Sequence, residues 1–474
     1  MKTIIVWYRN DLRLSDHPAL ITAVEAADVV VPVFIFNDSL LTGHHSSANR
    51  NRFLLECLSD LKHNLQAKGS DLLVRSGQAE EILVALANEL EADEIYYSAD
   101  YTPHAIKRDK AVKAALESAG LKFRGFPGRL AVSSLENLKT KAGTLHKVFT
   151  PFYKNWLQIE RRQLAVLPDS LTPLATHIDV GNFEVIEDSI DTKLLSPDVL
   201  KGGETAARKR LTEFLDTGIN TYQETNNNMS MAGTSRLSSY LHFGCLSPLE
   251  IETLLPQSTG AEAWRRQLAW REFYHYILFF FPNNAQQEFQ ERFRSLKWEK
   301  NETAFVAWAL GKTGYPVVDA AMRQLLQEGW MHNRSRLIVG SFLTKDLGLD
   351  WRLGEQHFMR WLIDGDEANN NGNWQWIASV GVDPAPVFRR LYNPTLQQLN
   401  YDPDGSYVRK FVPELNDVPD KYLAEPWTTP AAIQQSSNCL IGRDYPAPIV
   451  DHKLARVAAL DRYREASASQ ITDS

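Results

Sequence analysis

The chain of 474 residues has little cysteine and no long apolar stretch. Its three cysteines, Cys57, Cys245 and Cys439, form no CxxC pair, and such a sparse, odd count argues against a disulfide framework and against a zinc site. The most apolar window, residues 274–281, is far shorter than the ~20 residues that span a bilayer. Charged residues follow the first apolar run at once, unlike a signal peptide. We therefore expect a cytoplasmic protein that contacts no membrane.

An excess of positive charge is also missing. Lys and Arg total 51 against 58 Asp and Glu, so the net charge of −7 gives no general affinity for nucleic acid. Any contact with DNA must come from a local group of basic side chains. A hydrophobic fraction of 44% and a charged fraction of 23% are ordinary for globular proteins and exclude wholesale disorder. The length suggests more than one domain.

Tryptophan, in contrast, is abundant and unevenly placed. Of 12 Trp, only Trp7 and Trp156 precede residue 200. A buried indole N–H needs a hydrogen-bond partner, so each buried Trp requires an acceptor nearby. The second half of the chain therefore holds either an unusually aromatic core or a site that uses aromatic rings.

Residues 1–130 predict an α/β domain. Apolar runs rich in β-branched residues alternate with amphipathic stretches such as 52–67, which is typical of a parallel sheet with helices on both faces. We expect a Rossmann-like, doubly wound sheet of five strands, at residues 3–8, 29–36, 72–75, 94–98 and 122–126. No GxGxxG follows the first strand, so the dinucleotide fingerprint is absent. A crevice at the carboxyl ends of the strands can still hold a ligand.

The rest of the chain divides into three parts. Prolines and an acidic run interrupt residues 131–203, which we interpret as an interdomain linker over the surface. Residues 204–465 have helical periodicity almost throughout and predict a large all-helical domain. Within it, Ser247, Pro248 and Glu250 indicate a helix start with a capping box. Residues 466–474 predict a flexible tail.

Two segments of the helical region have side chains that suit ligands. In residues 233–240, GTSRLSSY, hydroxyl groups and Arg236 stand at the start of a helical run. Such a position suits phosphate, although simple N-capping explains the hydroxyl groups too. In residues 264–274, a helix would place Gln267, Trp270, Arg271 and Tyr274 on one face. That face suits an exposed nucleic-acid base, and a core helix with solvated charges is the ordinary alternative.

Two further segments combine polar groups with Trp, at residues 330–336, WMHNRSR, and at residues 364–376, DGDEANNNGNWQW. Buried carboxylates and amides need partners, and a heteroaromatic ligand with many donors and acceptors would supply them. Asp364 and Asp366 are also a plausible pair for a divalent metal. No histidine or further carboxylate stands at a supporting spacing, so we expect no metal site.

These segments, together with WYRNDLR at residues 7–13 and KTGYPVVDAAMR at residues 312–323, closely resemble the photolyase/cryptochrome family over nearly the whole chain. The resemblance implies an α/β domain that can hold an antenna chromophore, followed by a helical domain that holds FAD. The (6-4) branch typically has a second histidine where this chain has Asn333. The sequence is therefore most similar to the bacterial cyclobutane pyrimidine dimer (CPD) photolyases.

The resemblance implies a set of FAD contacts. Residues 234–238 would hold the pyrophosphate, Asp364 and Asp366 would accept hydrogen bonds from the flavin or the sugar, and Arg336 would stabilise a flavin that becomes anionic. Asn370 would lie beside flavin N5, where plant-type cryptochromes have an acid. The expected contacts are Tyr222, Thr234, Ser235, Arg236, Leu237, Ser238, Trp264, Gln267, Arg271, Asn333, Arg336, Asp364, Asp366 and Asn370.

A second set of residues would bind UV-damaged DNA, single- or double-stranded. Trp270 and Trp376 match the pair that stacks on the flipped dimer, and such stacking contributes ~1–3 kcal/mol per base. Arg334 and Arg389 match contacts to phosphates that flank the lesion, with Arg390 and Arg294 as neighbouring candidates. The expected lesion and DNA contacts are Trp270, Asn333, Arg334, Leu337, Trp376 and Arg389.

The reaction implied by the resemblance is light-driven repair by a monomer. Photoexcited reduced FAD would pass an electron to the flipped dimer, the cyclobutane ring would open, and the electron would return. Trp374, Trp351 and Trp298 match the family's electron-relay triad, with three core aromatics as the plain alternative. Asn370 and Gln267 complete the residues that we expect to take part in catalysis.

Three positions depart from the pattern of dimer-repair enzymes. Gln267 stands where these enzymes usually have Glu, Leu337 where a Met packs on the dimer, and Asn226 where an Arg often touches phosphate. These departures keep two alternatives open: a cryptochrome-like blue-light photoreceptor with weak or no repair activity, and a DNA-binding protein with a structural flavin.

The second chromophore is open as well. In folate-binding relatives, a Glu of the α/β domain contacts the pterin, whereas this chain has His104 and Ala105 at that place. The antenna is therefore a folate, a deazaflavin or absent.

Overall fold

A computed structural model describes residues 1–37, 41–43, 46–174 and 178–469. The chain begins with a parallel five-stranded sheet in the order β3-β2-β1-β4-β5. The predicted sheet is confirmed, and β3 alone begins one residue later than expected. The strands are β1 (Thr3–Tyr8), β2 (Val29–Phe36), β3 (Leu73–Ser76), β4 (Glu94–Ser98) and β5 (Lys122–Phe126).

Helices cover both faces of this sheet, as its sequence pattern predicts. Along β1, Ile4 and Val6 join one buried cluster with residues of α1 (Pro18–Ala26) and α3 (Ala48–Ala67). Ile5 and Trp7 point to the other face and join a cluster with residues of α4 (Ala79–Glu89) and α5 (Pro103–Ser118). Successive side chains of a strand point to opposite faces, and a sheet buried on both faces reads as a continuous apolar run.

The segment at residues 131–203 is more than a surface linker. It contains α6 (Phe149–Trp156), η1 (Leu135–Asn137), α7 (Glu184–Asp188) and η2 (Thr192–Leu194). Phe149, Phe152 and Trp156 of α6 are buried in the core. The Trp156 indole donates to the buried carboxylate of Glu272 over 2.7 Å. Helices this short give too few residues for a clear apolar periodicity, and the surrounding prolines indicate loops. The sequence therefore suggested only a linker.

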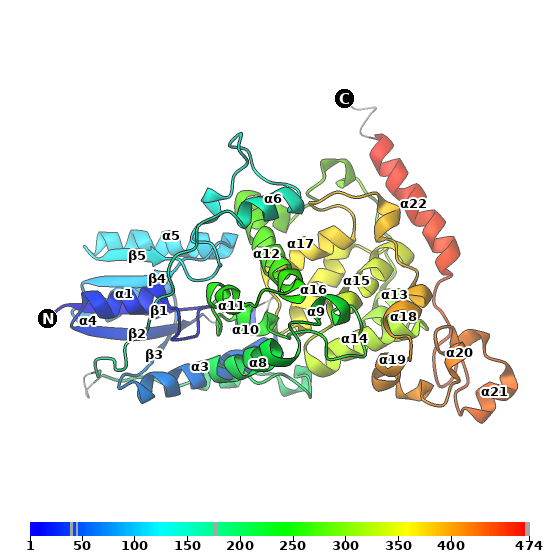
Figure 1. The fold of residues 1–474 in the computed structure, drawn as a ribbon, viewed down its shortest axis with the longest axis horizontal. Helices are drawn as coiled ribbons and strands as arrows, with labels where there is room; N and C mark the ends of the chain where they lie inside the picture. The colour runs from blue at the N-terminus through cyan, green and yellow to red at the C-terminus, as the bar shows by residue number, and fades with distance from the viewer. Residues whose placement is uncertain (38–40, 44–45, 175–177, 470–474) are drawn as a thin grey trace.

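Residues from Glu204 onward form the predicted helical domain (Figure 1). Its helices are α8 (Glu204–Thr217), α9 (Tyr222–Thr225), α10 (Ser238–His242), α11 (Pro248–Leu254), α12 (Thr259–Phe280), α13 (Glu302–Ala309), α14 (Pro316–Glu328), α15 (Asn333–Ser341), α16 (Trp351–Trp361), α17 (Glu367–Ile377), α18 (Pro394–Tyr401), α19 (Ser406–Phe411), α20 (Asp420–Leu423), α21 (Ala431–Ser436) and α22 (His452–Ser469), with short 3₁₀ and π segments between them. The predicted N-cap of α11 is confirmed, because the Ser247 hydroxyl accepts from the Glu250 amide.

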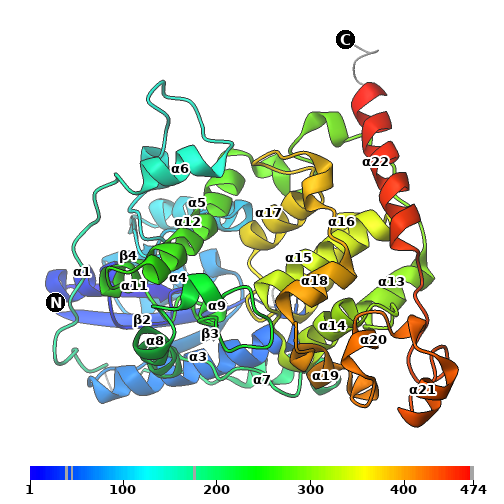
Figure 2. The same cartoon turned by 45° about the vertical axis from the view of Figure 1, so that its right-hand side comes forward.

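The long helix α12 passes through the middle of the molecule, beside α17, in both views (Figures 1 and 2). The hydroxyl of Ser258 caps its amino end by accepting from the Ala261 amide over 3.2 Å. Buried residues occur on all sides of its carboxyl-terminal half, as expected of a helix enclosed by other elements.

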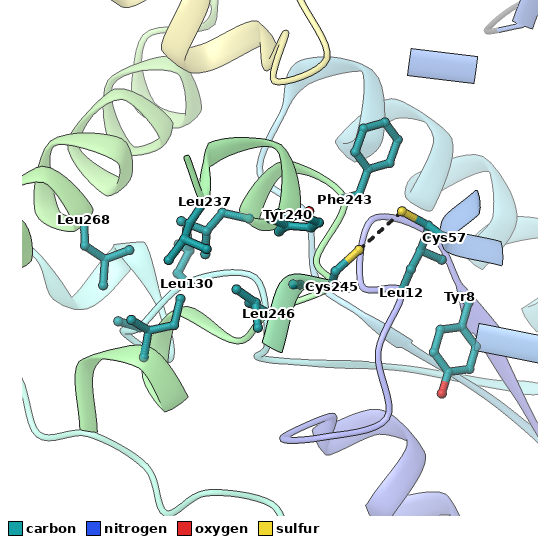
Figure 3. Close-up of a cluster of buried hydrophobic side chains, with 14 of the residues drawn as sticks. Tyr8, Leu12, Cys57, Leu130, Leu237, Tyr240, Phe243, Cys245, Leu246 and Leu268 are labelled. Atoms are coloured by element: carbon teal, nitrogen blue, oxygen red, sulfur yellow. Dashed lines mark hydrogen bonds between the residues drawn. The ribbon is translucent and has the colours of Figure 1, made fainter. Parts of the chain in front are cut away.

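One continuous buried cluster joins the two domains (Figure 3). Leu12 and Cys57 of the α/β domain meet Tyr240, Cys245 and Leu246 of the helical domain there. The thiols of Cys57 and Cys245 are hydrogen-bonded at 3.4 Å, and both cysteines are free. The two domains therefore share a packed core and are not joined by a flexible linker alone.

The carboxyl-terminal helix α22 runs to Ser469, so residues 466–469 are helical where we expected a flexible tail. Ala466 is buried against the core of the helical domain, and this contact continues the helix. Residues 470–474 of the expected tail lie outside the described residues. Among the helices that the structure describes, none has the length and apolarity needed to cross a membrane.

We predict that Trp156→Phe destabilises the protein by ~1.5–3 kcal/mol, because the buried carboxylate of Glu272 loses a donor. Urea unfolding would measure the change. Adding Glu272→Gln should recover part of the loss, since a neutral amide tolerates the missing donor better than a charge. Equal stability of Trp156→Phe and the unmodified protein would contradict the account.

Candidate functional site

A cavity of about 440 Å³ opens in the helical domain, within the usual range for ligand sites of ~300–1,000 Å³. Residues from α9, α10, α12, α15, α16 and α17 and from the loops between them surround it. Every residue expected to contact FAD lines this one cavity. They are Tyr222, Thr234, Ser235, Arg236, Leu237, Ser238, Trp264, Gln267, Arg271, Asn333, Arg336, Asp364, Asp366 and Asn370.

The loop before α10 presents hydroxyl groups at one end of the cavity. Arg210 of α8 holds this loop by donating to the carbonyls of Thr234 and Ser235, over 3.0 and 2.8 Å. The Trp264 indole donates to the Ser235 hydroxyl over 3.2 Å. Because α10 begins at Ser238 and is only five residues long, the hydroxyl groups matter more for an anion than any helix dipole.

Arg236 is held in place at this end. Its backbone is in the left-handed region, with φ of 54°, which is unusual for a residue other than glycine. Its guanidinium pairs with Glu328 over 2.9 Å and lies 4.2 Å from the centre of the Trp330 ring. Trp330 lines the cavity too. Glu328, the partner that holds Arg236, is 92 positions away in the sequence, and no local pattern reveals such a partner.

Carboxylates occupy another part of the wall. Asp364 pairs with Arg336 over 2.8 Å, and Arg336 also donates to the carbonyl of Met331. Asp366 caps α17 by accepting from the Asn369 amide over 2.8 Å. Burial alone would raise the pKa of Asp366, but nearby His275, His242 and Arg271 favour its charged form and hold the pKa well below its ordinary value. Hydrogen bonds therefore fix both carboxylates, and the neighbouring positive groups keep Asp366 in its charged form.

Asn370 has a fixed orientation as well. Its Nδ2 donates to the backbone carbonyl of Glu355 over 2.9 Å, which leaves Oδ1 as an acceptor. Asn371 donates to the Glu355 carboxyl group over 3.1 Å. Burial raises the pKa of Glu355 to about 7. Nothing in the sequence around Glu355 resembles a ligand motif, so its place beside Asn370 was not predicted.

Arg271 lies at the border between the domains. It donates to the carbonyls of Arg129 and Leu241, over 3.1 and 3.3 Å, and burial lowers its pKa. One side chain thus faces the cavity and also ties α12 to the end of the α/β domain.

The residues expected to clamp a lesion line the same cavity: Trp270, Asn333, Leu337 and Trp376, together with Gln267. The Trp270 ring is stacked on Phe149 of α6, with centroids 3.7 Å apart and planes 7° apart. The guanidinium of Arg390 lies 3.8 Å from the centre of the Trp376 ring. Each Trp therefore has a packing partner and also lines the cavity.

The expected phosphate contacts lie outside the cavity walls. Arg334 donates to Asn227 over 2.7 Å and covers the Tyr401 ring at 4.2 Å. Arg389 lies on η6 (Val387–Arg390) and is exposed. Arg390 is only 2% exposed and donates to the Trp376 carbonyl, so it supports the Trp and is not available to a phosphate. Arg294 is engaged with Glu288 and Glu291.

Trp374, Trp351 and Trp298 belong to one core region and differ in depth. Trp374 lines the cavity and is 3% exposed, and Trp351 is fully buried. Trp298 is half-buried against the same cluster, with Arg462 over its ring at 5.7 Å. The relay role of these three rings stays a prediction. Trp308 also contacts Trp374, edge to face, with centroids 6.1 Å apart.

A crevice for a second chromophore would lie where β1 and β4 end. Arg9 crosses this place: it donates to the carbonyl of Ser98 and pairs with Asp109 over 2.6 Å. Its guanidinium lies over the rings of Trp7 and Tyr97, at 4.7 and 4.8 Å from their centres. The identity of the second chromophore stays a prediction.

The cavity residues fit FAD. Hydroxyl groups and Arg236 at one end suit a pyrophosphate, while fixed carboxylates and the Asn370 acceptor suit the donor groups of a flavin and a sugar. Within the described part of the chain, the buried indole N–H of Trp376 has no hydrogen-bond partner, and a molecule in the cavity would supply one.

Known proteins resemble this chain along its whole length. A family model described as DNA photolyase matches residues 4–171, and one described as the FAD binding domain of DNA photolyase matches residues 264–465. A deoxyribodipyrimidine photo-lyase of Agrobacterium fabrum is 38% identical over 472 residues, which are 97% of each chain. A class III photolyase from Agrobacterium tumefaciens matches with a TM-score of 0.91 at 36% identity, over 99% of this chain and 98% of that one. A cryptochrome from Synechocystis matches with a TM-score of 0.89 at 29% identity, over 98% and 99% of the two chains.

The fold and the site therefore define a two-domain FAD-binding protein. More particularly, the chain belongs to the DNA photolyase family.

We predict that Glu355→Gln stabilises the flavin-free protein by about 1–2 kcal/mol at pH 8, and by less at pH 5. The pKa of Glu355 is raised from 4.5 to about 7 in the folded protein. Its ionisation therefore lowers the free energy of unfolding as pH rises from about 4.5 to about 7, and causes no further loss above that range. Denaturant unfolding at several pH values would measure the difference. Glu160→Gln, at an exposed position, is the control. A difference that grows toward acid pH would contradict the assignment.

Proposed function

We propose that this protein splits cyclobutane pyrimidine dimers in UV-damaged DNA under blue or near-UV light, with FAD as its cofactor. The observation that carries the proposal is the sharing of one cavity: the aromatic clamp Trp270 and Trp376 and the flavin-type ligands Asp364 and Asn370 line the same space. A base bound by the clamp would lie next to the cofactor, as electron transfer between them requires. The class III photolyase and the curated relatives carry names of the same activity.

FAD in its reduced form supplies the chemistry when bound: on illumination it provides the electron that opens the cyclobutane ring, and it takes the electron back. The protein's part is to bind, orient and exclude water. Asn370 offers Oδ1 to a donor of the cofactor, because its Nδ2 is held by Glu355. Asp364, paired with Arg336, keeps a carboxylate and a guanidinium together in the wall. A positive charge close to the cofactor favours its anionic form.

The clamp would receive the lesion after it leaves the stack. Flipping costs a few kcal/mol, less for a damaged and poorly paired step, and this difference supplies part of the selectivity. Phe149 covers one face of Trp270 and the ring lines the cavity, so a base would stack on the side turned away from Phe149. Arg334 and Arg389 would contact the flanking phosphates, which fits a small, local basic patch on an acidic protein.

Gln267 is exposed to the cavity and retains the donor and acceptor that reading a base edge requires. It lacks the negative charge of a Glu. Leu337 offers an apolar surface in place of a Met. Both therefore keep the contacts of a dimer-repair site and change its electrostatics and its polarisability.

The second candidate is a blue-light photoreceptor that signals and does not repair, and Gln267 and Leu337 together with the likeness to a cryptochrome favour it. Asn370 and the paired Trp270 and Trp376 favour repair. A DNA-binding protein with a structural flavin is the third reading of the same site.

Repair of a defined thymine dimer in an oligonucleotide decides among these functions. We expect light-dependent loss of the dimer by the FAD-loaded, chemically reduced protein. Trp270→Ala should weaken binding of the damaged oligonucleotide by roughly 10–100-fold, as expected for one lost stacking contact. Trp427→Phe, outside the cavity, is the control.

Binding without loss of the dimer under light would favour a structural flavin. Absence of both lesion binding and light-dependent dimer loss would favour the photoreceptor.

We predict that Trp298→Phe slows photoreduction of the oxidised flavin and leaves repair by the pre-reduced protein nearly intact. The reason is position: Trp298 is half-buried at the outer end of the proposed relay and does not line the cavity. Absorbance during illumination measures photoreduction, and the oligonucleotide assay measures repair. Equal loss of both activities would remove the relay assignment.

A further inference from the structure

The amino end of α3 belongs to the α/β domain but makes its contacts in the helical domain. Asn49 donates through Nδ2 to the carbonyl of Trp361 over 2.6 Å. Arg50 donates through Nη1 to the carbonyls of Met359 and Leu362, the latter over 3.0 Å. These three carbonyls are at the carboxyl end of α16, where a helix leaves its last carbonyls without intrahelical partners. Two residues of one domain therefore cap a helix of the other.

The cap is buried and charged. Asn49 is fully buried, and its Oδ1 accepts from the Ser196 amide over 2.8 Å. Burial lowers the pKa of Arg50 to about 10, and the nearby carboxylate of Asp364 acts in the opposite direction. Arg50 thus stays a cation at neutral pH and lies at the negative end of the α16 dipole.

Glycines of two cavity segments make room for this cap. A Cβ at Gly365, between Asp364 and Asp366, would lie 2.7 Å from Arg50 Nη1. A Cβ at Gly329 would lie 2.9 Å from Asn49 Nδ2. Gly329 precedes the segment that bears Trp330 and Arg336, and its carbonyl accepts from the Ile363 amide over 2.9 Å. Asn49 and Arg50 therefore lie against the backbone of both segments that supply the carboxylates and the guanidinium of the cavity wall.

We propose that Asn49 and Arg50 of the α/β domain are positioning residues for FAD in the helical domain. They hold the carbonyls of Met359, Trp361 and Leu362 just before the loop that carries the two carboxylates. The loop then places Asp364 against Arg336 and Asp366 at the cap of α17, both at the cavity. The inference rests on the proposed function only in that the cavity holds FAD; it does not depend on DNA repair. It gives the α/β domain a part in flavin retention with or without a second chromophore.

Release of FAD from the full-length, FAD-loaded protein tests the proposal. In the dark and without DNA, flavin fluorescence should rise about tenfold faster or more in Arg50→Ala than in the unmodified protein, because charge-assisted bonds to the loop are lost. The visible circular dichroism of the remaining bound flavin should change. Arg50→Lys keeps a cation that can reach a carbonyl and should recover part of the retention. Arg52→Ala is the control, since Arg52 lies on the same helix, is exposed and pairs with Glu56 of that helix.

Two further variants keep the test informative if Arg50→Ala does not fold. Asn49→Asp is isosteric, keeps the acceptor for Ser196, loses the donor to Trp361, and should also release FAD faster. Gly365→Ala should speed release in the unmodified protein but add little in Arg50→Lys, where the crowding guanidinium is absent. Release at the unmodified rate in Asn49→Asp and Arg50→Ala would overturn the proposal. So would fully multiplicative effects of Gly365→Ala and Arg50→Lys.

Discussion

Helices α12 and α17 approach so closely that a Cβ at Gly372 would lie 2.1 Å from the Tyr274 ring. This contact sets the distance between the two groups of functional side chains. Gln267, Trp270 and Arg271 extend from α12, and Asn370, Trp374 and Trp376 extend from α17, into one cavity. The other elements of the site are arranged around this pair: α10 and its preceding loop close one end, and α15 and the loop after α16 close another. A wider separation of α12 and α17 would separate the clamp from the cofactor.

Much of the fold follows from local sequence pattern. Strands of a doubly wound sheet are buried on both faces, so their continuous apolar runs have clear limits, and the predicted limits agree with the structure to within one residue. Motif resemblance located the cavity residues, because close packing around a large ligand demands particular side chains at fixed spacing. The structure gathers them in one cavity, and their individual roles stay predictions.

What the sequence did not reveal depends on contacts between distant segments. Phe149 acquires a function only through Trp270, Trp330 only through Arg236, and Glu355 only through Asn370 and Asn371. Arg390 resembled a phosphate ligand in the sequence because it follows Arg389, but its burial against Trp376 gives it a supporting role. Such pairings are set by tertiary packing, and neither periodicity nor composition records them.

The paired thiols of Cys57 and Cys245 stand on opposite sides of the domain boundary, buried and 3.4 Å apart (Figure 3). An alkylating reagent reaches them only when α3 separates from the loop after α10. The rate at which these two thiols are modified thus reports opening between the domains, and its ratio to the rate of an exposed thiol gives the free energy of that opening. Since α3 also bears Asn49 and Arg50, the same rate reports how often the cavity loop loses its hydrogen bonds to the neighbouring domain.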